Sequence, residues 1–202
     1  MSLLNLYNKM KNEFDHDNGF TDKGLPYHTY IEFYEKYFSA YKNKSVSLLE
    51  IGVNHGGSLE MWKKYFTKYK LAGVDITENP IADKPYVQSL TTDSNITLKF
   101  GRSSADPEVA SEFKNGSFNF IIDDGSHEPD VQIETFKVWA KKVKKGGVYF
   151  IEDILTPDLF PSMRLEIQKF CDENDIKVTF EEFHGDKTQL NRIDDIILVV
   201  NM

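Results

Sequence analysis

The chain has 202 residues, 40% of them hydrophobic and 13% aromatic, which fits one folded globular domain with a substantial core. Its formal net charge of −8 argues against a general nucleic-acid surface, because binding to phosphates depends on clustered Lys and Arg. No apolar stretch is long enough to span a bilayer, the N-terminus lacks a signal-peptide pattern, and the single cysteine, Cys171, excludes an internal disulfide framework. We therefore expect a cytoplasmic protein with no membrane and no nucleic-acid partner.

The N-terminal part is predicted to be helical. Apolar residues at helical spacing predict helices over residues 3–14 and 27–41, separated by a polar loop. The second helix carries an aromatic stripe, which is typical of packing. These aromatic helices could also contribute to a subunit interface, so the chain could form a homo-oligomer.

Helices and strands alternate through the rest of the chain. Strands are expected at residues 46–52, 71–76, 96–100, 118–123 and 148–152, with helices at 59–69, 107–114 and 131–145. A helix at 162–174 then leads to strands at 176–183 and 195–200, which a short polar turn separates. This order predicts a Rossmann-like three-layer α/β sandwich, with a mostly parallel seven-stranded sheet and a C-terminal antiparallel hairpin.

Acidic residues follow two of the predicted strands. Asp123 and Asp124 end one apolar run, and Glu152 and Asp153 end another. Ligands bind at the carboxyl edge of an open parallel sheet, so Asp124, Glu152 and Asp153 form an oxygen-rich site suited to Mg²⁺. His127 follows Asp124 by three residues and has an ordinary pKa near neutrality, as a general base requires.

Plainer interpretations of these residues remain open. Asp124 could cap the following turn, and His127 could be an ordinary loop histidine. Glu152 and Asp153 could be a solvated strand end or the N-cap of the next segment. The coincidence of two acidic strand ends with a histidine favours catalysis by Asp124 and His127.

A glycine-rich turn, Gly52-Val53-Asn54-His55-Gly56-Gly57-Ser58, lies between a predicted strand and a helix. Glycine allows the backbone to approach a ligand closely, but the spacing is not the dinucleotide G-x-G-x-x-G. Asp75, about twenty residues beyond the turn, is placed to bind a ribose diol. Together these features favour an adenosine-containing cofactor without a pyrophosphate, and S-adenosylmethionine is the obvious candidate.

Four blocks of the sequence carry a family resemblance. They are Thr21-Asp22-Lys23-Gly24 with His28, Tyr30, Tyr34 and Glu35; Leu48-Leu49-Glu50-Ile51-Gly52 with Gly56-Gly57-Ser58; Ile122-Asp123-Asp124-Gly125-Ser126-His127; and Gly146-Gly147-Val148-Tyr149-Phe150-Ile151-Glu152-Asp153. With these blocks the chain resembles class I S-adenosylmethionine-dependent methyltransferases, and more closely the macrocin- and mycinamicin-type sugar O-methyltransferases. The resemblance implies a single methyltransferase domain over residues 1–202, in which residues 1–44 form a helical cap over the active site.

The resemblance also implies roles for individual residues. The cofactor would be bound by Glu50, Gly52, Gly56, Gly57, Ser58, Asp75, Asp106 and Asp123, with Asp106 near the adenine. Magnesium would be bound by Asp124, Glu152 and Asp153, and His127 would be the general base. The expected function is Mg²⁺-assisted methylation of a hydroxyl on a small, sugar-like molecule.

Two other functions remain as alternatives. A hydroxylase or an NAD-linked oxidoreductase could use a similar scaffold, although an iron oxygenase prefers two histidines and a carboxylate. A non-catalytic cofactor-binding module is the second alternative, but it has no need of a base beside an acid cluster.

Overall fold

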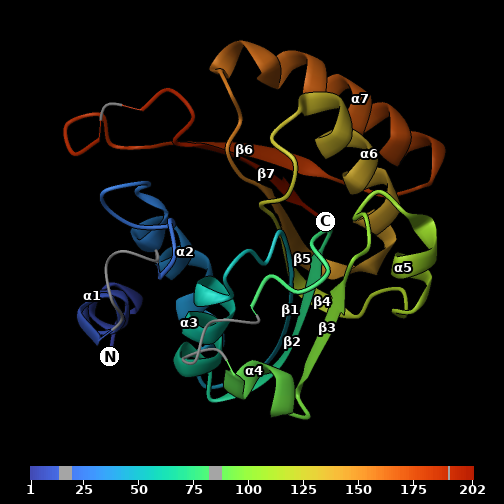
Figure 1. Ribbon diagram of the computed structural model, residues 1–202. Helices are drawn as coiled ribbons and strands as arrows, with labels where there is room; N and C mark the ends of the chain where they lie inside the picture. The colour runs from blue at the N-terminus through green and yellow to red at the C-terminus, as the bar shows by residue number, and fades with distance from the viewer. Residues whose placement is uncertain (14–19, 82–87, 191) are drawn as a thin grey trace.

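The computed structural model describes residues 1–13, 20–81, 88–190 and 192–202. Its centre is a seven-stranded sheet with the strand order β3-β2-β1-β4-β5-β7-β6 (Figure 1). The strands are β1 (Ser45–Ile51), β2 (Lys68–Asp75), β3 (Ile96–Phe100), β4 (Phe118–Asp123), β5 (Val143–Ile151), β6 (Thr179–His184) and β7 (Ile196–Asn201). Strands β1 to β5 are parallel, and β7 runs antiparallel to both β5 and β6. The predicted Rossmann-like sheet with its C-terminal antiparallel pair is therefore confirmed.

Helices cover both faces of this sheet. They are α1 (Leu3–Glu13), α2 (Tyr30–Phe38), α3 (Gly57–Tyr65), α4 (Gln88–Thr92), α5 (Pro107–Ser111), α6 (Pro129–Trp139) and α7 (Phe160–Glu173), with short 3₁₀ turns η2 (Ser39–Tyr41), η4 (Ala140–Lys142) and η5 (Pro157–Leu159). Helices α1 to α4 lie on one side and α5 to α7 on the other (Figure 1). None of the helices in the described ranges is long and apolar enough to cross a membrane.

The central strands are buried on both faces, which explains their continuous apolar runs. Successive side chains of a strand point to opposite faces. In β1, Leu48 joins the core beneath α1 to α3, whereas its neighbour Leu49 joins the core beneath α5 to α7. The same division holds for Phe150 and Tyr149 of β5. Parallel sheets covered by helices on both faces show this pattern.

Several predicted helix ends are wrong: α2 begins at Tyr30 and α5 ends at Ser111, and two further helices end early because the sheet extends further than the local pattern indicates. The helix expected over 59–69 ends at Tyr65, and Lys68 already pairs with Ser45 in the ladder between β2 and β1. The helix expected over 131–145 ends at Trp139, because β5 begins at Val143. Backbone pairing with a neighbouring strand thus overrides the helix propensity of these Lys-rich segments. The short helix α4 has no counterpart in the predicted elements.

The aromatic stripe of α2 packs on the sheet, as expected. Phe33 and Tyr34 contact Phe150 with ring centroids 5.8 and 5.2 Å apart. Phe38 lies 4.8 Å from Phe120 and 5.1 Å from Trp62, and it is fully buried. These rings fix α2 directly above β4 and β5.

We predict that Phe38→Ala lowers the free energy of unfolding by about 3–5 kcal/mol, because it leaves a cavity in a closely packed aromatic cluster. Urea denaturation followed by circular dichroism measures the change. Leu165→Ala is the control, since Leu165 is exposed on α7, and its effect should stay within about 0.5 kcal/mol. Equal effects of the two substitutions would contradict this account of the core.

Candidate active site

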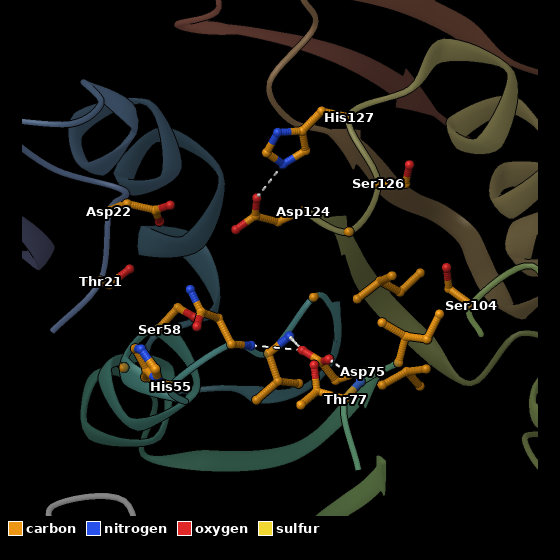
Figure 2. Close-up of a pocket in the computed structure, with 18 of the residues that line it drawn as sticks. Thr21, Asp22, His55, Ser58, Asp75, Thr77, Ser104, Asp124, Ser126 and His127 are labelled. Carbon is orange, nitrogen blue, oxygen red and sulfur yellow. Dashed lines mark hydrogen bonds and ion pairs between the residues drawn. The ribbon is translucent and has the colours of Figure 1, made fainter. Parts of the chain in front are cut away.

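A cavity of about 750 Å³ lies at the carboxyl ends of β1, β2 and β4 (Figure 2). The strand order reverses direction between β1 and β4, and open α/β sheets bind their ligands at such a switch point. One half of the wall comes from the glycine turn and from the loops after β2 and β3. The other half comes from the N-terminal segment and the loop after β4. The lining residues are Phe20, Thr21, Asp22, Tyr27, Ile51, Gly52, Val53, Asn54, His55, Gly57, Ser58, Val74, Asp75, Ile76, Thr77, Ser103, Ser104, Asp124, Gly125, Ser126, His127 and Val131.

Two glycines of the turn allow other backbone segments to pack closely against it. Gly52 has a φ of +82°, and a Cβ there would lie 1.9 Å from the carbonyl oxygen of Asp124. A Cβ on Gly57 would lie 1.2 Å from the carbonyl oxygen of Phe20. These two glycines therefore let the β4 loop and the N-terminal segment pack directly against the turn.

Asp75 fixes the turn to the end of β2. Its Oδ2 accepts hydrogen bonds from the backbone N–H groups of Val53, at 2.8 Å, and Asn54, at 2.9 Å. Its Oδ1 accepts a third from the N–H of Thr77, at 2.8 Å. The carboxylate lines the cavity, at the position expected for a ribose-binding group (Figure 2).

Four of the expected cofactor residues do not line the cavity: Glu50, Gly56, Asp106 and Asp123. Asp106 caps α5 by accepting a hydrogen bond from the N–H of Glu108, and Ser103 and Ser104, from the same loop, line the cavity. Asp123 accepts a hydrogen bond from the Tyr149 hydroxyl, and burial raises its pKa to about 7.

The ladder of the sheet carries the acidic residues into the site. The N–H of Asp124 donates to the carbonyl of Ile51, and the N–H of Glu152 donates to the carbonyl of Asp123. Each acid thus continues the pairing one residue beyond its strand. Asp153 then turns out of the sheet with a φ of +55°, a backbone conformation that is costly for any residue but glycine.

Asp124 and His127 line the cavity, and Asp153 lies next to them without lining it. One ligand atom from each lies within 4.8 Å of the others, and no further group of this kind occurs in the described parts of the chain. The Nε2 of His127 lies 3.6 Å from Oδ1 of Asp124 and 3.6 Å from Oδ2 of Asp153. A hydrogen bond to Asp124 and the nearby carboxylates raise the pKa of His127. Two carboxylates side by side are the hard oxygen donors that Mg²⁺ prefers, so these residues fit such an ion.

Glu152 was expected to be a metal ligand, but its carboxylate contacts other residues of the chain. Its Oε2 lies 2.7 Å from Nζ of Lys23, and its Oε1 accepts a hydrogen bond from the hydroxyl of Tyr34. The structure therefore places this carboxylate beside Lys23, outside the group formed by Asp124, His127 and Asp153.

Lys23 is the main residue that the sequence pattern did not single out. Its ammonium also lies 2.8 Å from Oδ2 of Asp124 and 3.4 Å from Oε1 of Glu50. Burial disfavours the ammonium form, but the carboxylates of Asp124, Glu152 and Glu50 outweigh burial and raise the pKa of Lys23 well above its usual value. Burial raises the pKa of Glu50 to about 7, even with Lys23 beside it. The only sequence signal for this lysine was its place in a block of the family resemblance.

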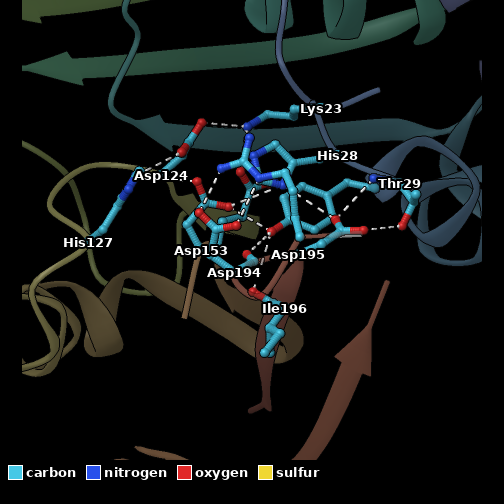
Figure 3. A network of polar contacts seen from close by, with 12 residues as sticks. Lys23, His28, Thr29, Asp124, His127, Asp153, Asp194, Asp195 and Ile196 are labelled. Atoms are coloured by element: carbon cyan, nitrogen blue, oxygen red, sulfur yellow. Dashed lines mark hydrogen bonds and ion pairs between the residues drawn. The ribbon is translucent and has the colours of Figure 1, made fainter. Parts of the chain in front are cut away.

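A second group of contacts, made by residues 28–30 and Asp195, holds Asp153 in place (Figure 3). The hydroxyl of Tyr30 donates to Oδ1 of Asp153 at 2.6 Å. The Nδ1 of His28 lies 3.6 Å from the same oxygen and 3.3 Å from Oδ1 of Asp195. Asp195 in turn accepts hydrogen bonds from the N–H and the hydroxyl of Thr29. The N-terminal segment thus holds both the left-handed Asp153 and the start of β7.

Comparison with known proteins agrees with this architecture. A family model described as a methyltransferase domain matches residues 49–154, just over half of the chain. Demethylmacrocin O-methyltransferase from Streptomyces fradiae is 32% identical over 145 residues, which are 67% of this chain and 34% of that protein. Mycinamicin VI 2''-O-methyltransferase from Micromonospora griseorubida is 33% identical over 144 residues, with 68% and 34% covered.

A solved structure shows the same fold over the full chain. The MycE methyltransferase of the mycinamycin biosynthetic pathway, in complex with Mg, SAH and mycinamycin VI, superimposes with a TM-score of 0.70 at 25% sequence identity. The match covers 100% of this chain and 54% of that one. This chain thus spans about a third of the length of its curated relatives and about half of MycE. On the family model, the sheet order and the glycine turn at its switch point, the chain belongs to the methyltransferase domain family.

Proposed function

We propose that this domain is an S-adenosylmethionine-dependent, Mg²⁺-assisted O-methyltransferase that acts on a hydroxyl of a sugar or a glycosylated small molecule. One observation carries the proposal. A single cavity is lined by the glycine turn and Asp75 on one side and by Asp124 and His127 on the other, and Asp153 lies next to these last two residues. The relatives named for sugar O-methylation and the Mg and SAH of the MycE complex support this assignment.

The two halves of the cavity would have different roles. Asp75 holds the turn in place through the backbone N–H groups of Val53 and Asn54, and its wall of the cavity takes the adenosine part of the methyl donor. S-adenosylmethionine would supply the methyl group as an electrophilic sulfonium. We propose that Gly52, Gly57 and Ser58 border its methionine part, since they line the adjoining wall. Residues 1–44 would cap the cavity, to which Thr21, Asp22 and Tyr27 already contribute side chains.

The acidic half would activate the acceptor hydroxyl. Asp124 and Asp153 would hold the Mg²⁺, which supplies Lewis acidity that lowers the pKa of a bound hydroxyl. His127 would accept the hydroxyl proton at Nε2, the nitrogen that faces both carboxylates. Tyr30 keeps Asp153 aimed at this place through its 2.6 Å hydrogen bond to Oδ1. Holding donor and acceptor in one cavity would supply much of the acceleration through proximity.

Cofactor choice is tested by calorimetry with S-adenosylmethionine, S-adenosylhomocysteine and NAD. We expect both sulfur compounds to bind and NAD not to bind, because the glycine turn lacks the spacing of a pyrophosphate cradle. Asp75→Ala should weaken the binding of both sulfur compounds at least tenfold, since it removes the hydrogen bonds that hold the turn and the partner of the ribose hydroxyls. Binding of NAD alone would overturn the methyltransferase proposal in favour of an oxidoreductase.

The role of His127 is tested by His127→Ala. We expect turnover to fall by a factor of about 100 or more, with S-adenosylhomocysteine affinity within about twofold, because general-base catalysis typically contributes 10²–10⁴-fold. A screen of sugar acceptors with labelled cofactor provides the assay. The control is His184→Ala, since His184 is half-exposed on β6 and does not line the cavity. Unchanged turnover of His127→Ala would remove the histidine from the mechanism.

The metal is tested by Asp153→Asn. We expect the Mg²⁺ concentration for half-maximal activity to rise at least tenfold, because a charged oxygen ligand is lost. Asp158→Asn is the matched control on the exposed turn η5 and should leave Mg²⁺ dependence unchanged. An enzyme that stays fully active in excess chelator would refute the metal requirement.

A further inference from the structure

Lys23 is placed unlike any other basic residue in the described parts of the chain. It is the only lysine or arginine there that is buried, with no exposed surface. Charged side chains are almost never fully buried unless they are paired. Here one ammonium donates hydrogen bonds to the carboxylates of Asp124 and Glu152 and lies 3.4 Å from that of Glu50.

The three carboxylates come from three neighbouring strands. Glu50 belongs to β1, Asp124 follows β4 and Glu152 follows β5, and these strands lie side by side in the order β1-β4-β5. One ammonium therefore bridges the carboxyl ends of the central sheet. Without it, the buried carboxylates of Glu50 and Glu152 and the partly exposed one of Asp124 would face one another with no lysine between them.

The backbone around Lys23 is fixed at both sides. On one side, Phe20 packs its carbonyl directly against Gly57 at the start of α3. On the other, the carbonyl of Lys23 accepts a hydrogen bond of 3.0 Å from the N–H of Tyr30, at the start of α2. The side chain thus reaches the acids from a rigid support.

The two oxygens of Asp124 face different partners. Oδ2 lies 2.8 Å from the ammonium of Lys23, whereas Oδ1 lies 3.6 Å from Nε2 of His127 (Figure 3). The orientation of this carboxylate is therefore set from its buried side by Lys23. Its other oxygen is left for the cavity.

We propose that Lys23 is a positioning residue, which holds Oδ2 of Asp124 so that Oδ1 faces the divalent-cation and acceptor side of the cavity. This inference rests on the proposed function, since it assigns Asp124 to cation binding. Lys23 acts only through Asp124 and touches neither cation nor substrate. The same ammonium lies beside Glu50 and Glu152, and its attraction for them keeps these buried acids next to Asp124.

The test compares Mn²⁺ binding, measured by electron paramagnetic resonance, between Glu152→Gln and the double variant Lys23→Met/Glu152→Gln. The Glu152→Gln background removes a buried acid that Lys23→Met alone would leave without its counter-ion. Near-ultraviolet circular dichroism establishes that each variant keeps its tertiary structure. Lys63→Met is the matched control, because Lys63, on α3, pairs with Asp93 and with none of the acids around Lys23.

The sign of the effect separates positioning from simple electrostatics. Removing a positive charge near the site would by itself strengthen cation binding. A positioning role instead predicts that the double variant binds Mn²⁺ at least tenfold more weakly than Glu152→Gln, because Asp124 is free to turn away. Lys63→Met should bind Mn²⁺ within about twofold of the wild-type chain.

Equal or tighter Mn²⁺ binding by the folded double variant would overturn the proposal. So would a wild-type chain that binds no Mn²⁺, because Asp124 would then not be aimed at a cation. Failure of the wild-type chain to bind S-adenosylhomocysteine would contradict the proposed methyl transfer, yet the Mn²⁺ comparison would still decide the role of Lys23.

Discussion

A single buried ammonium, that of Lys23, holds together the acidic residues at the carboxyl ends of three parallel strands. Removing one partner of a buried ion pair typically costs about 3–5 kcal/mol, because the other charge stays in a poorly solvating interior. Glu50, Asp124 and Glu152 all lie within 3.4 Å of this ammonium. The concentration of acids at the sheet edge therefore depends on a residue that comes from a distant part of the sequence.

The N-terminal segment is tied to the site by the same contacts. Four side chains of this segment and of α2 contact the acids at the ends of β4 and β5. Lys23 contacts Asp124, Tyr34 contacts Glu152, and His28 and Tyr30 contact Asp153. The aromatic side of α2 packs on β4 and β5, so its hydroxyl groups meet the acids where those strands end. Packing and polar contacts thus fix one geometry, in which Asp153 is held at a left-handed φ and aimed at His127.

Much of the fold follows from local patterns, and much of the site follows from the order of the strands. Apolar runs that end in acidic residues predicted the strands. The parallel topology then places Asp124 and Asp153 at the carboxyl edge of the sheet. The predicted helix over 59–69 was too long at its C-terminal end, because pairing between Ser45 and Lys68 is a long-range contact that local propensity does not contain. The partner of Glu152 was missed for the same reason, since Lys23 lies 129 residues away in the sequence.

Asp106 shows a different limit. An acid after β3 matched the expected position of an adenine contact, but a carboxylate just before Pro107 serves equally well as a helix N-cap. The sequence alone does not distinguish the two uses. The structure shows the cap and gives the cavity wall to Ser103 and Ser104.

The proposed mechanism places the methyl donor in one cavity with a cation that activates the acceptor. It is tested most directly by crystals grown with S-adenosylhomocysteine and Mn²⁺, in which anomalous scattering locates the metal. The account predicts one Mn²⁺ peak bound by Asp124 and Asp153, and the ribose of S-adenosylhomocysteine at Asp75. A metal peak away from both aspartates, or a nucleoside bound outside the glycine turn, would contradict it.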